Sequence, residues 1–391
     1  MIFSVGLIYS KALLSISLGG FLLYALWLRR STLLHEFRGF AKAWPYVGLT
    51  LVFVVYVLAG IHTADTDQWL KQVRIKLPFL LLPLSFYLIR SLTERQFKFM
   101  HAVIAGLSMI SAVPVLWYYY QHKAELIAAI GHGQSIPTPI DHIHYSIILA
   151  YSSCVLLLLL ADGCLAKSRL EHWLYSGLAA GVAVVLHILA VRSGLAIFYL
   201  GLAFVVVWYV YSSRQYVVGG IGLLLLLSAP YVMYKTVPSL HKKVSYMMYD
   251  IQQYRQGNGN NFSDSERLMS YTIAADLIRQ QPLVGHGIGD LEPLMVAEHK
   301  ARYGEKEKYI YPHNQYLYVL VGAGFLGFIF FFGGLLSPVV FMKPDPYIWL
   351  TYIAMLAAFM VENTLERAVS VAFFLVVLLY AVGRSRGCAV R

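Results

Sequence analysis

Long apolar runs recur along the whole chain, separated by short polar segments. We predict membrane-spanning helices near 5–28, 44–62, 73–89, 99–120, 142–161, 173–190, 194–211, 216–234, 313–335, 347–362 and 369–383. Each run approaches the roughly 20 apolar residues that a helix needs to cross a bilayer. The pattern therefore predicts an all-α, polytopic membrane protein.

Lys11 interrupts the first apolar run. If residues 2–10 and 12–28 form separate segments, the chain has twelve spans and both termini lie on one side of the membrane. If they form one helix, the count is eleven. The first half of the run is short for a span, so the residues alone leave both counts open.

One long polar interruption divides the chain into three regions. These are an N-terminal transmembrane bundle (1–234), a long loop (235–312), and C-terminal transmembrane helices with a short tail (313–391). In the loop, Ser263 and Glu266 fit a capping box ahead of a helix over 268–281. A second, amphipathic helix is predicted over 290–302. The loop is thus expected to be helical.

Composition and charge agree with a membrane protein. The chain is 59% hydrophobic and 13% charged, whereas a soluble domain has about 25% charged residues. The net charge of +11 could suggest nucleic acid. However, most basic residues follow alternate spans, as Arg29, Arg38, Arg214 and Lys343 do. The positive-inside rule makes that side cytoplasmic, so membrane lipids, and not nucleic acid, are the expected partners of the remaining charge.

The 235–312 loop then faces the opposite, outer side, where ionisable residues at span ends point to function. Arg192 lies in a tight outer turn between two spans, although an arginine can also reach the interface without any further role. Arg267 lies at the start of the loop helix, where a solvated helix face or an ion pair with Glu266 is an equally good explanation. Both arginines are therefore candidates for binding a negatively charged substrate.

His313 is the candidate for proton transfer. It follows a proline where the chain re-enters the membrane, beside the polar side chains of Asn314 and Gln315. The positive end of a helix dipole favours a neutral imidazole, and a neutral imidazole can act as a general base. The plainer alternative is a packed or capping histidine.

A basic cluster at the outer start of the third span includes Arg74 and Lys76. Such residues suit phosphate binding through charge-assisted hydrogen bonds. Asp65 and Asp67 precede them and can also neutralise their charge. We expect Arg74 and Lys76, with Asn314 and Gln315, to contact the substrate.

Three segments together resemble the O-antigen ligase superfamily. They are Arg192-Ser-Gly194, Arg267 with the glycine-rich run 282–289, and His313-Asn-Gln-Tyr-Leu317 with the glycine-rich run 322–327. The resemblance covers residues 142–335. It implies twelve spans with both termini cytoplasmic, a periplasmic active site in the bacterial inner membrane, and no metal or other cofactor. It also implies essential roles for Arg192, Arg267 and His313.

The superfamily contains lipopolysaccharide O-antigen ligases, O-antigen polymerases and protein O-oligosaccharyltransferases. The last usually have a longer C-terminal region than this chain, which favours the ligase. The resemblance implies a glycan donor on undecaprenyl pyrophosphate and a sugar hydroxyl of lipid A–core as acceptor. Arginines would stabilise the pyrophosphate leaving group, and His313 would activate the hydroxyl, with inversion at the anomeric carbon.

Three alternatives are weighed against this prediction. A polymerase or another lipid-linked oligosaccharide transferase of the same superfamily would use a different acceptor, which for the polymerase is a second lipid-linked glycan. A metal-dependent lipid-linked glycosyltransferase would hold Mg²⁺ or Mn²⁺ through Asp65 and Asp67. A secondary transporter would show inverted repeats and charges at mid-membrane, and the sequence has neither a convincing repeat nor that charge pattern.

Overall fold

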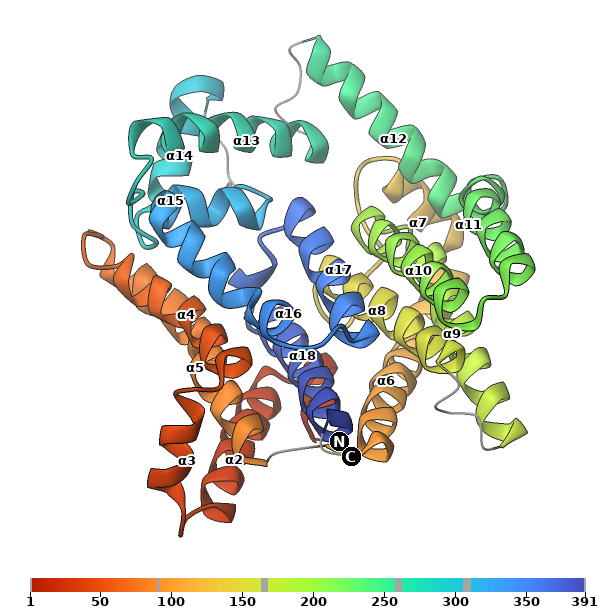
Figure 1. The fold of residues 1–391 in the computed structure, drawn as a ribbon. Coiled ribbons are helices and arrows are strands. Elements are labelled where there is room, and N and C mark those ends of the chain that lie inside the picture. Colours follow the sequence, from red (N-terminus) through yellow and green to blue (C-terminus); the bar gives the residue numbers. More distant parts are fainter. Residues whose placement is uncertain (1, 90–91, 163–167, 257–261, 305–310, 390–391) are drawn as a thin grey trace. The chain divides into compact units, whose positions relative to one another are not determined.

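The computed structural model describes residues 2–89, 92–162, 168–256, 262–304 and 311–389, and within these ranges it contains helices and no strand (Figure 1). Nine of the described helices are long and apolar enough to cross a membrane. They are α2 (Lys11–Leu28), α5 (Thr66–Ile89), α6 (Glu94–Gln121), α8 (His142–Ala161), α9 (Arg169–Leu189), α10 (Arg192–Ser213), α11 (Tyr216–Thr236), α15 (Gln315–Leu335) and α18 (Ala368–Ala389). The predicted polytopic all-α class is confirmed.

The remaining elements are shorter or more polar. They are α1 (Ile2–Tyr9), α3 (Leu33–Phe40), α4 (Trp44–Leu58), α7 (Lys123–Ile130), α12 (Pro238–Arg255), α13 (Ser263–Gln280), α14 (Leu291–Tyr303), α16 (Ser337–Phe341), α17 (Pro346–Val361) and the 3-10 turn η2 (Thr364–Glu366). Helices α3 and α4, bent by 80°, make a tenth candidate span if they are taken together, and α17 is a shorter apolar helix.

The N-terminal apolar run is divided into two helices next to Lys11, the residue that interrupts it in the sequence. Helix α1 ends at Tyr9 and α2 begins at Lys11. An eight-residue helix is about 12 Å long, well short of the roughly 30 Å of a bilayer core. Helix α1 therefore does not supply a twelfth span by itself.

The chain forms two compact units, neither of them continuous in sequence. Unit 1 comprises Met1–Leu14, Thr93–Gln252 and Pro346–Ala358, and unit 2 comprises Ser15–Leu92, Gln253–Asp345 and Phe359–Arg391. Both units therefore draw on more than one of the three regions predicted from the chain order. Arg192 belongs to unit 1, whereas Arg267 and His313 belong to unit 2.

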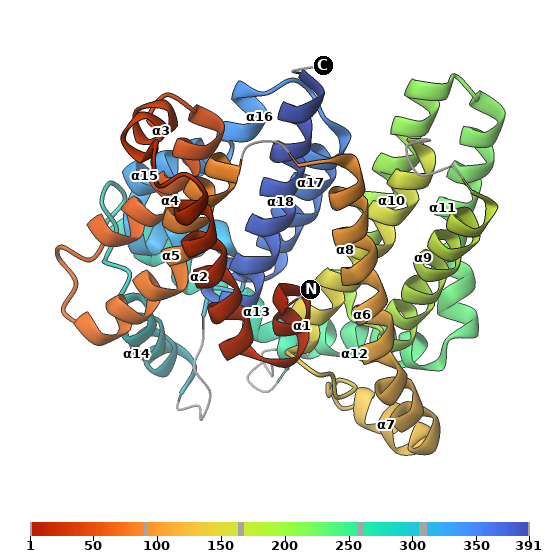
Figure 2. The same ribbon diagram turned by 90° about the horizontal axis from the view of Figure 1, so that it is seen from below.

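Unit 1 is built around α8, which is 83% buried over its apolar stretch and packs against α6, α9 and α10 (Figure 2). Small residues allow α10 to approach α8 closely. A Cβ on Gly194 would come within 2.5 Å of the Ser146 Cβ, and one on Gly201 within 2.7 Å of the Cys154 sulfur. Close packing of this kind replaces the hydrophobic effect between helices in lipid, and it fixes the start of α10, where Arg192 lies.

In unit 2, α4 packs against α5, α15 and α16, and α5 packs against α18. The polar helices α13 and α14 contact α15 and each other (Figure 1). Helix α14 confirms the amphipathic helix predicted over 290–302. The unit thus places the helices of the long loop directly on the membrane helix that follows His313.

Helix α15 is broken at Gly324, whose backbone has φ 63° and ψ −172°. The glycine-rich loop after α13 fills the break with main-chain hydrogen bonds. These join the His286 amide to the Val321 carbonyl (2.8 Å), Gly287 to Gly322 (3.0 Å), Phe325 to Pro282 (2.8 Å) and Leu326 to Leu283 (3.1 Å). Non-helical backbone within a membrane helix needs such partners. The two glycine-rich segments of the sequence are therefore structural partners.

The predicted capping box is wrong. Helix α13 already includes Ser263, and Phe262 holds the N-cap position without a side-chain cap. The Glu266 amide donates to the Phe262 carbonyl at 2.9 Å, so the first helical bond begins one residue before the serine. The Ser263 hydroxyl therefore stands inside the first turn and not at the cap.

Candidate functional site

His313 lies immediately before the N-cap of α15. The cap is Asn314, whose side-chain oxygen accepts from the amides of Tyr316 (2.9 Å) and Leu317 (3.1 Å). Asn314 also donates from Nδ2 to the Met360 carbonyl at 3.2 Å. The sequence thus placed His313 correctly at a helix start, two residues before the first helical residue.

Glu362 is the partner of His313. The imidazole Nδ1 lies 3.1 Å from Glu362 Oε2 and 3.3 Å from Oε1, and the side chains are 31% and 10% exposed, respectively. A carboxylate can only accept a hydrogen bond, so this pairing places the hydrogen on Nδ1 and leaves Nε2 to accept a proton. A base oriented by a second group in this way is typical of nucleophile activation.

Glu362 is a candidate site residue that the sequence prediction did not include. It follows α17 directly, and its Oε1 also accepts from the Asn363 amide at 3.2 Å. The signal that could have revealed it is the one that pointed to Arg192, an ionisable residue at the end of an apolar helix. Its partner lies 49 positions away in the sequence, which the linear pattern does not reveal.

If His313 acts as the base that the sequence predicts, Glu362→Gln is expected to lower the rate of the predicted glycan transfer about 10- to 100-fold, as when an outer-shell acidic partner of a metal-bound histidine is changed. The amide keeps the shape but loses the charge that stabilises the imidazolium. Glu298→Gln, which alters a surface ion pair with Arg302, is the matched control. The measurement is the steady-state rate of transfer by the two purified variants. Equal rates for Glu362→Gln and Glu298→Gln would contradict a role for the His313–Glu362 pair.

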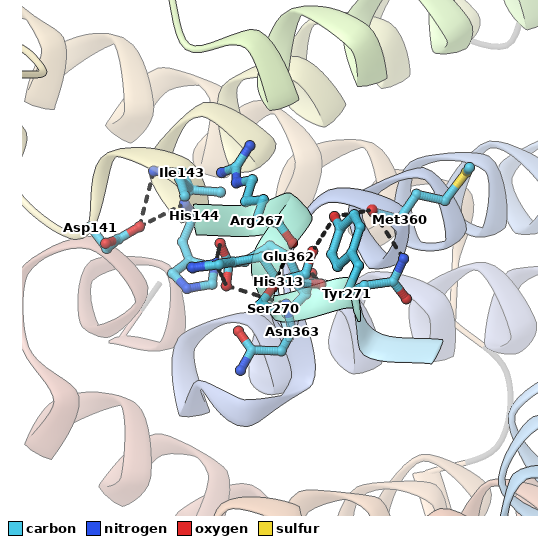
Figure 3. A network of polar contacts seen from close by, with 12 residues as sticks. Asp141, Ile143, His144, Arg267, Ser270, Tyr271, His313, Met360, Glu362 and Asn363 are labelled. Carbon is cyan, nitrogen blue, oxygen red and sulfur yellow. Dashed lines mark hydrogen bonds and ion pairs between the residues drawn. The ribbon is translucent and has the colours of Figure 1, made fainter. Parts of the chain in front are cut away.

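Tyr271 joins α13 to the same place. Its hydroxyl donates to the His313 carbonyl at 3.0 Å and to the Met360 carbonyl at 3.4 Å. Burial raises the pKa of Tyr271, so at neutral pH the phenol stays protonated and remains a donor. Tyr271 therefore ties together the backbone segments that carry His313 and Glu362 (Figure 3).

Arg267 lies one helical turn before Tyr271, so the two share a face of α13. The charge of Arg267 lowers the pKa of Tyr271 and that of Glu362 raises it, both by less than burial does, so both charges act on the same phenol. Arg267 is partly exposed, and Figure 3 shows it on the helix that carries Tyr271. The structure thus brings Arg267 and His313, 46 positions apart in sequence, into one part of unit 2.

Arg192 is the first residue of α10 in unit 1. Only Val191 separates it from Ala190, the C-cap of α9, which has a left-handed φ of 52°. In the last turn of α9, His187 Nε2 lies 2.8 Å from the Tyr199 hydroxyl. The arginine is partly exposed at this tight turn, as predicted, and its convergence with Arg267 and His313 stays a prediction.

The predicted substrate-binding residues divide into two groups. Arg74 is exposed, whereas Lys76, two positions later on α5, is fully buried. Gln315 is also fully buried, and its oxygen accepts from the Leu365 amide at 2.8 Å. Asn314 is engaged as a helix cap. Of the four, only Arg74 keeps a side chain exposed at the surface, and direct substrate contact by Lys76 and Gln315 has no support in the structure.

Asp65 and Asp67 have separate environments. Asp65 Oδ1 accepts from the Gln68 amide at 2.9 Å at the start of α5, and Asp67 is exposed. No group of three or more His, Cys, Asp or Glu side chains that could hold a metal occurs in the part of the chain that the structure describes. Helix capping thus accounts for Asp65.

The sequence was compared with models of known protein families, which tests the resemblance described above. Residues 155–332 match the family model described as O-antigen ligase. This segment is similar to the O-antigen ligase family. The match includes Arg192, Arg267, His313 and both glycine-rich segments, and it confirms the predicted resemblance; Glu362 lies beyond it. No curated protein matches the chain.

The O-antigen ligase family consists of glycosyltransferase-like membrane enzymes, with a lipid-linked glycan donor and a lipid acceptor in general. Such a transfer needs a group that takes a proton from a hydroxyl and a cation that stabilises a leaving phosphate, and His313 with Glu362, and Arg267, are side chains of these chemical types. The domain match and the geometry around His313 therefore agree.

Proposed function

We propose that this protein is an O-antigen ligase of lipopolysaccharide biosynthesis. It transfers a glycan from undecaprenyl pyrophosphate to a sugar hydroxyl of lipid A–core, at the periplasmic face of the bacterial inner membrane. The observation that carries the proposal is the His313–Glu362 pair, because it supplies an imidazole oriented by a carboxylate. Arg267 lies one helical turn before Tyr271, whose hydroxyl donates to the His313 carbonyl.

In the proposed reaction, His313 Nε2 takes the proton of the acceptor hydroxyl as its oxygen attacks the anomeric carbon. The bond from that carbon to the pyrophosphate oxygen breaks, with inversion. Glu362 stabilises the imidazolium that forms. Arg267 and Arg192 stabilise the negative charge on the leaving pyrophosphate, since guanidinium groups stay protonated and bind phosphate oxygens in pairs.

Arg74 is the remaining candidate for a contact with the diphosphate, because it is exposed in the N-terminal half of α5. The proposed chemistry assigns charge stabilisation to arginines and no step to a metal ion. Transfer is therefore expected to continue at its full rate in EDTA. A loss of activity that Mg²⁺ or Mn²⁺ restores would favour the metal-dependent alternative with Asp65 and Asp67.

The decisive experiment offers purified protein one defined undecaprenyl pyrophosphate glycan and two acceptors in separate reactions. A ligase glycosylates lipid A–core and leaves the second lipid-linked glycan unextended. Extension of the lipid-linked glycan alone would show a polymerase of the same superfamily. Transfer to neither acceptor would overturn the proposal.

A further inference from the structure

A buried polar network joins the two segments that carry the His313–Glu362 pair. Gln315 comes two residues after His313, and Glu366 four residues after Glu362. Gln315 Nε2 donates to Glu366 Oε1 at 2.9 Å, and its oxygen accepts from the Leu365 amide at 2.8 Å. The start of α15 and the η2 turn are thus bound together by hydrogen bonds that water does not reach.

Lys76 is the centre of this network. Its Nζ donates to Glu366 Oε2 at 2.9 Å and to the Leu365 carbonyl at 2.7 Å, and it lies 4.0 Å from the centroid of the Tyr56 ring. The Tyr56 hydroxyl donates to the other oxygen of Glu366. Lys76, Tyr56 and Gln315 are 0% exposed. Helices α4 and α5 thereby hold the η2 turn.

An ion pair of this kind is costly to bury, and replacing it with well-packed apolar residues is often neutral or stabilising. Net stabilisation of the fold is therefore a weak explanation for its presence. A lipid-linked substrate could not reach the ammonium group either, because the side chain has no exposed surface. What the network does define is the spacing between the η2 turn and the start of α15.

We propose that Lys76 is a positioning residue, which through Leu365 and Glu366 fixes the 362–366 turn against the start of α15 and so sets the contact between Glu362 and His313. This inference rests on the proposed function, because the contact matters only if His313 acts as the base. Lys76 acts through other residues and does not touch the substrate.

A double-mutant cycle tests the positioning role. Lys76→Met is expected to lower kcat roughly 10- to 100-fold, since small misplacements of a catalytic group have effects of that size. The KM for the lipid-linked donor stays within about twofold of wild type, because uniform binding is unchanged. Combined with Glu362→Gln, the loss should not multiply but stay close to that of the larger single variant, since both act on one contact.

Lys343→Met, at an exposed position in the same unit, is the matched control and should leave kcat unchanged. If Lys76→Met does not fold, Lys76→Met with Glu366→Gln takes its place, because it leaves no buried charge without a partner. The cycle is then repeated on that background.

The outcomes separate the two proposals. Suppose that wild type transfers glycan and His313→Ala does not. If the losses in kcat from Lys76→Met and Glu362→Gln then multiply, or if Lys76→Met raises the donor KM with kcat unchanged, only the positioning role is overturned. If wild type does not transfer, or His313→Ala transfers as wild type does, the proposed function fails and the positioning role with it. A loss confined to kcat and shared with Glu362→Gln supports both.

Discussion

Replacing His313 with alanine is expected to lower the rate of glycan transfer by roughly 10²–10⁴-fold, the usual contribution of a general base. The acceptor hydroxyl then keeps its proton during the attack. The fold should remain intact, because Asn314 still caps α15 and Gln315 still bonds to Leu365. Glu362 keeps its bond from the Asn363 amide.

The measurement is kcat for purified wild type and His313→Ala with defined donor and acceptor, together with thermal unfolding of both proteins. His172→Ala, which removes an exposed imidazole on α9, is the control and should transfer at the wild-type rate. A folded His313→Ala protein that transfers at nearly the wild-type rate would disprove the assignment of the base.

Replacing Gly324 with alanine is expected to lower the free energy of unfolding by about 3 kcal/mol or more, from backbone strain and overpacking together. Gly324 has a φ of 63°, and a Cβ there would lie 2.4 Å from the Leu283 carbonyl carbon. Gly285 faces it from the loop, with a φ of 71° and a Cβ position 2.6 Å from the Gly324 nitrogen. Neither neighbour can move aside, because the contacts are with backbone atoms.

Gly333→Ala supplies the matched control, since Gly333 lies on the same helix with nothing within 4 Å of its Cβ position. That variant should be neutral or more stable by about 0.5–1 kcal/mol, as for a helical glycine replaced by alanine. Unfolding of both proteins in detergent, by heat or denaturant, makes the comparison. Equal stability of the two variants would show that the break in α15 does not require glycine.

The fold class was predictable because apolar runs of bilayer length are a strong local signal. The start of α15 was predictable for a similar reason, since the sequence around Pro312 and Asn314 favours a helix start. The cap of α13 was mispredicted because Ser263 and Glu266 satisfy a motif that competes with a helix beginning one residue earlier. The correct predictions and the wrong one all rest on residues that are close to each other in the sequence.

The partners of the candidate site could not be predicted in the same way. Lys76 has the position expected of an outer phosphate ligand, yet its charge is neutralised by Glu366, 290 positions away. The pairing of His313 with Glu362 and that of Gly285 with Gly324 could not be predicted either, because the partners are far apart in the sequence. Only the folded chain brings these residues together.

The most direct test of the proposed site is an experimental structure of the protein with an undecaprenyl pyrophosphate glycan bound. We expect guanidinium nitrogens of Arg192 and Arg267 within about 3 Å of diphosphate oxygens, the distance of a charge-assisted hydrogen bond. His313 Nε2 should face the anomeric carbon from the side opposite the pyrophosphate. A diphosphate bound away from these arginines, or an anomeric carbon that His313 does not face, would contradict the mechanism.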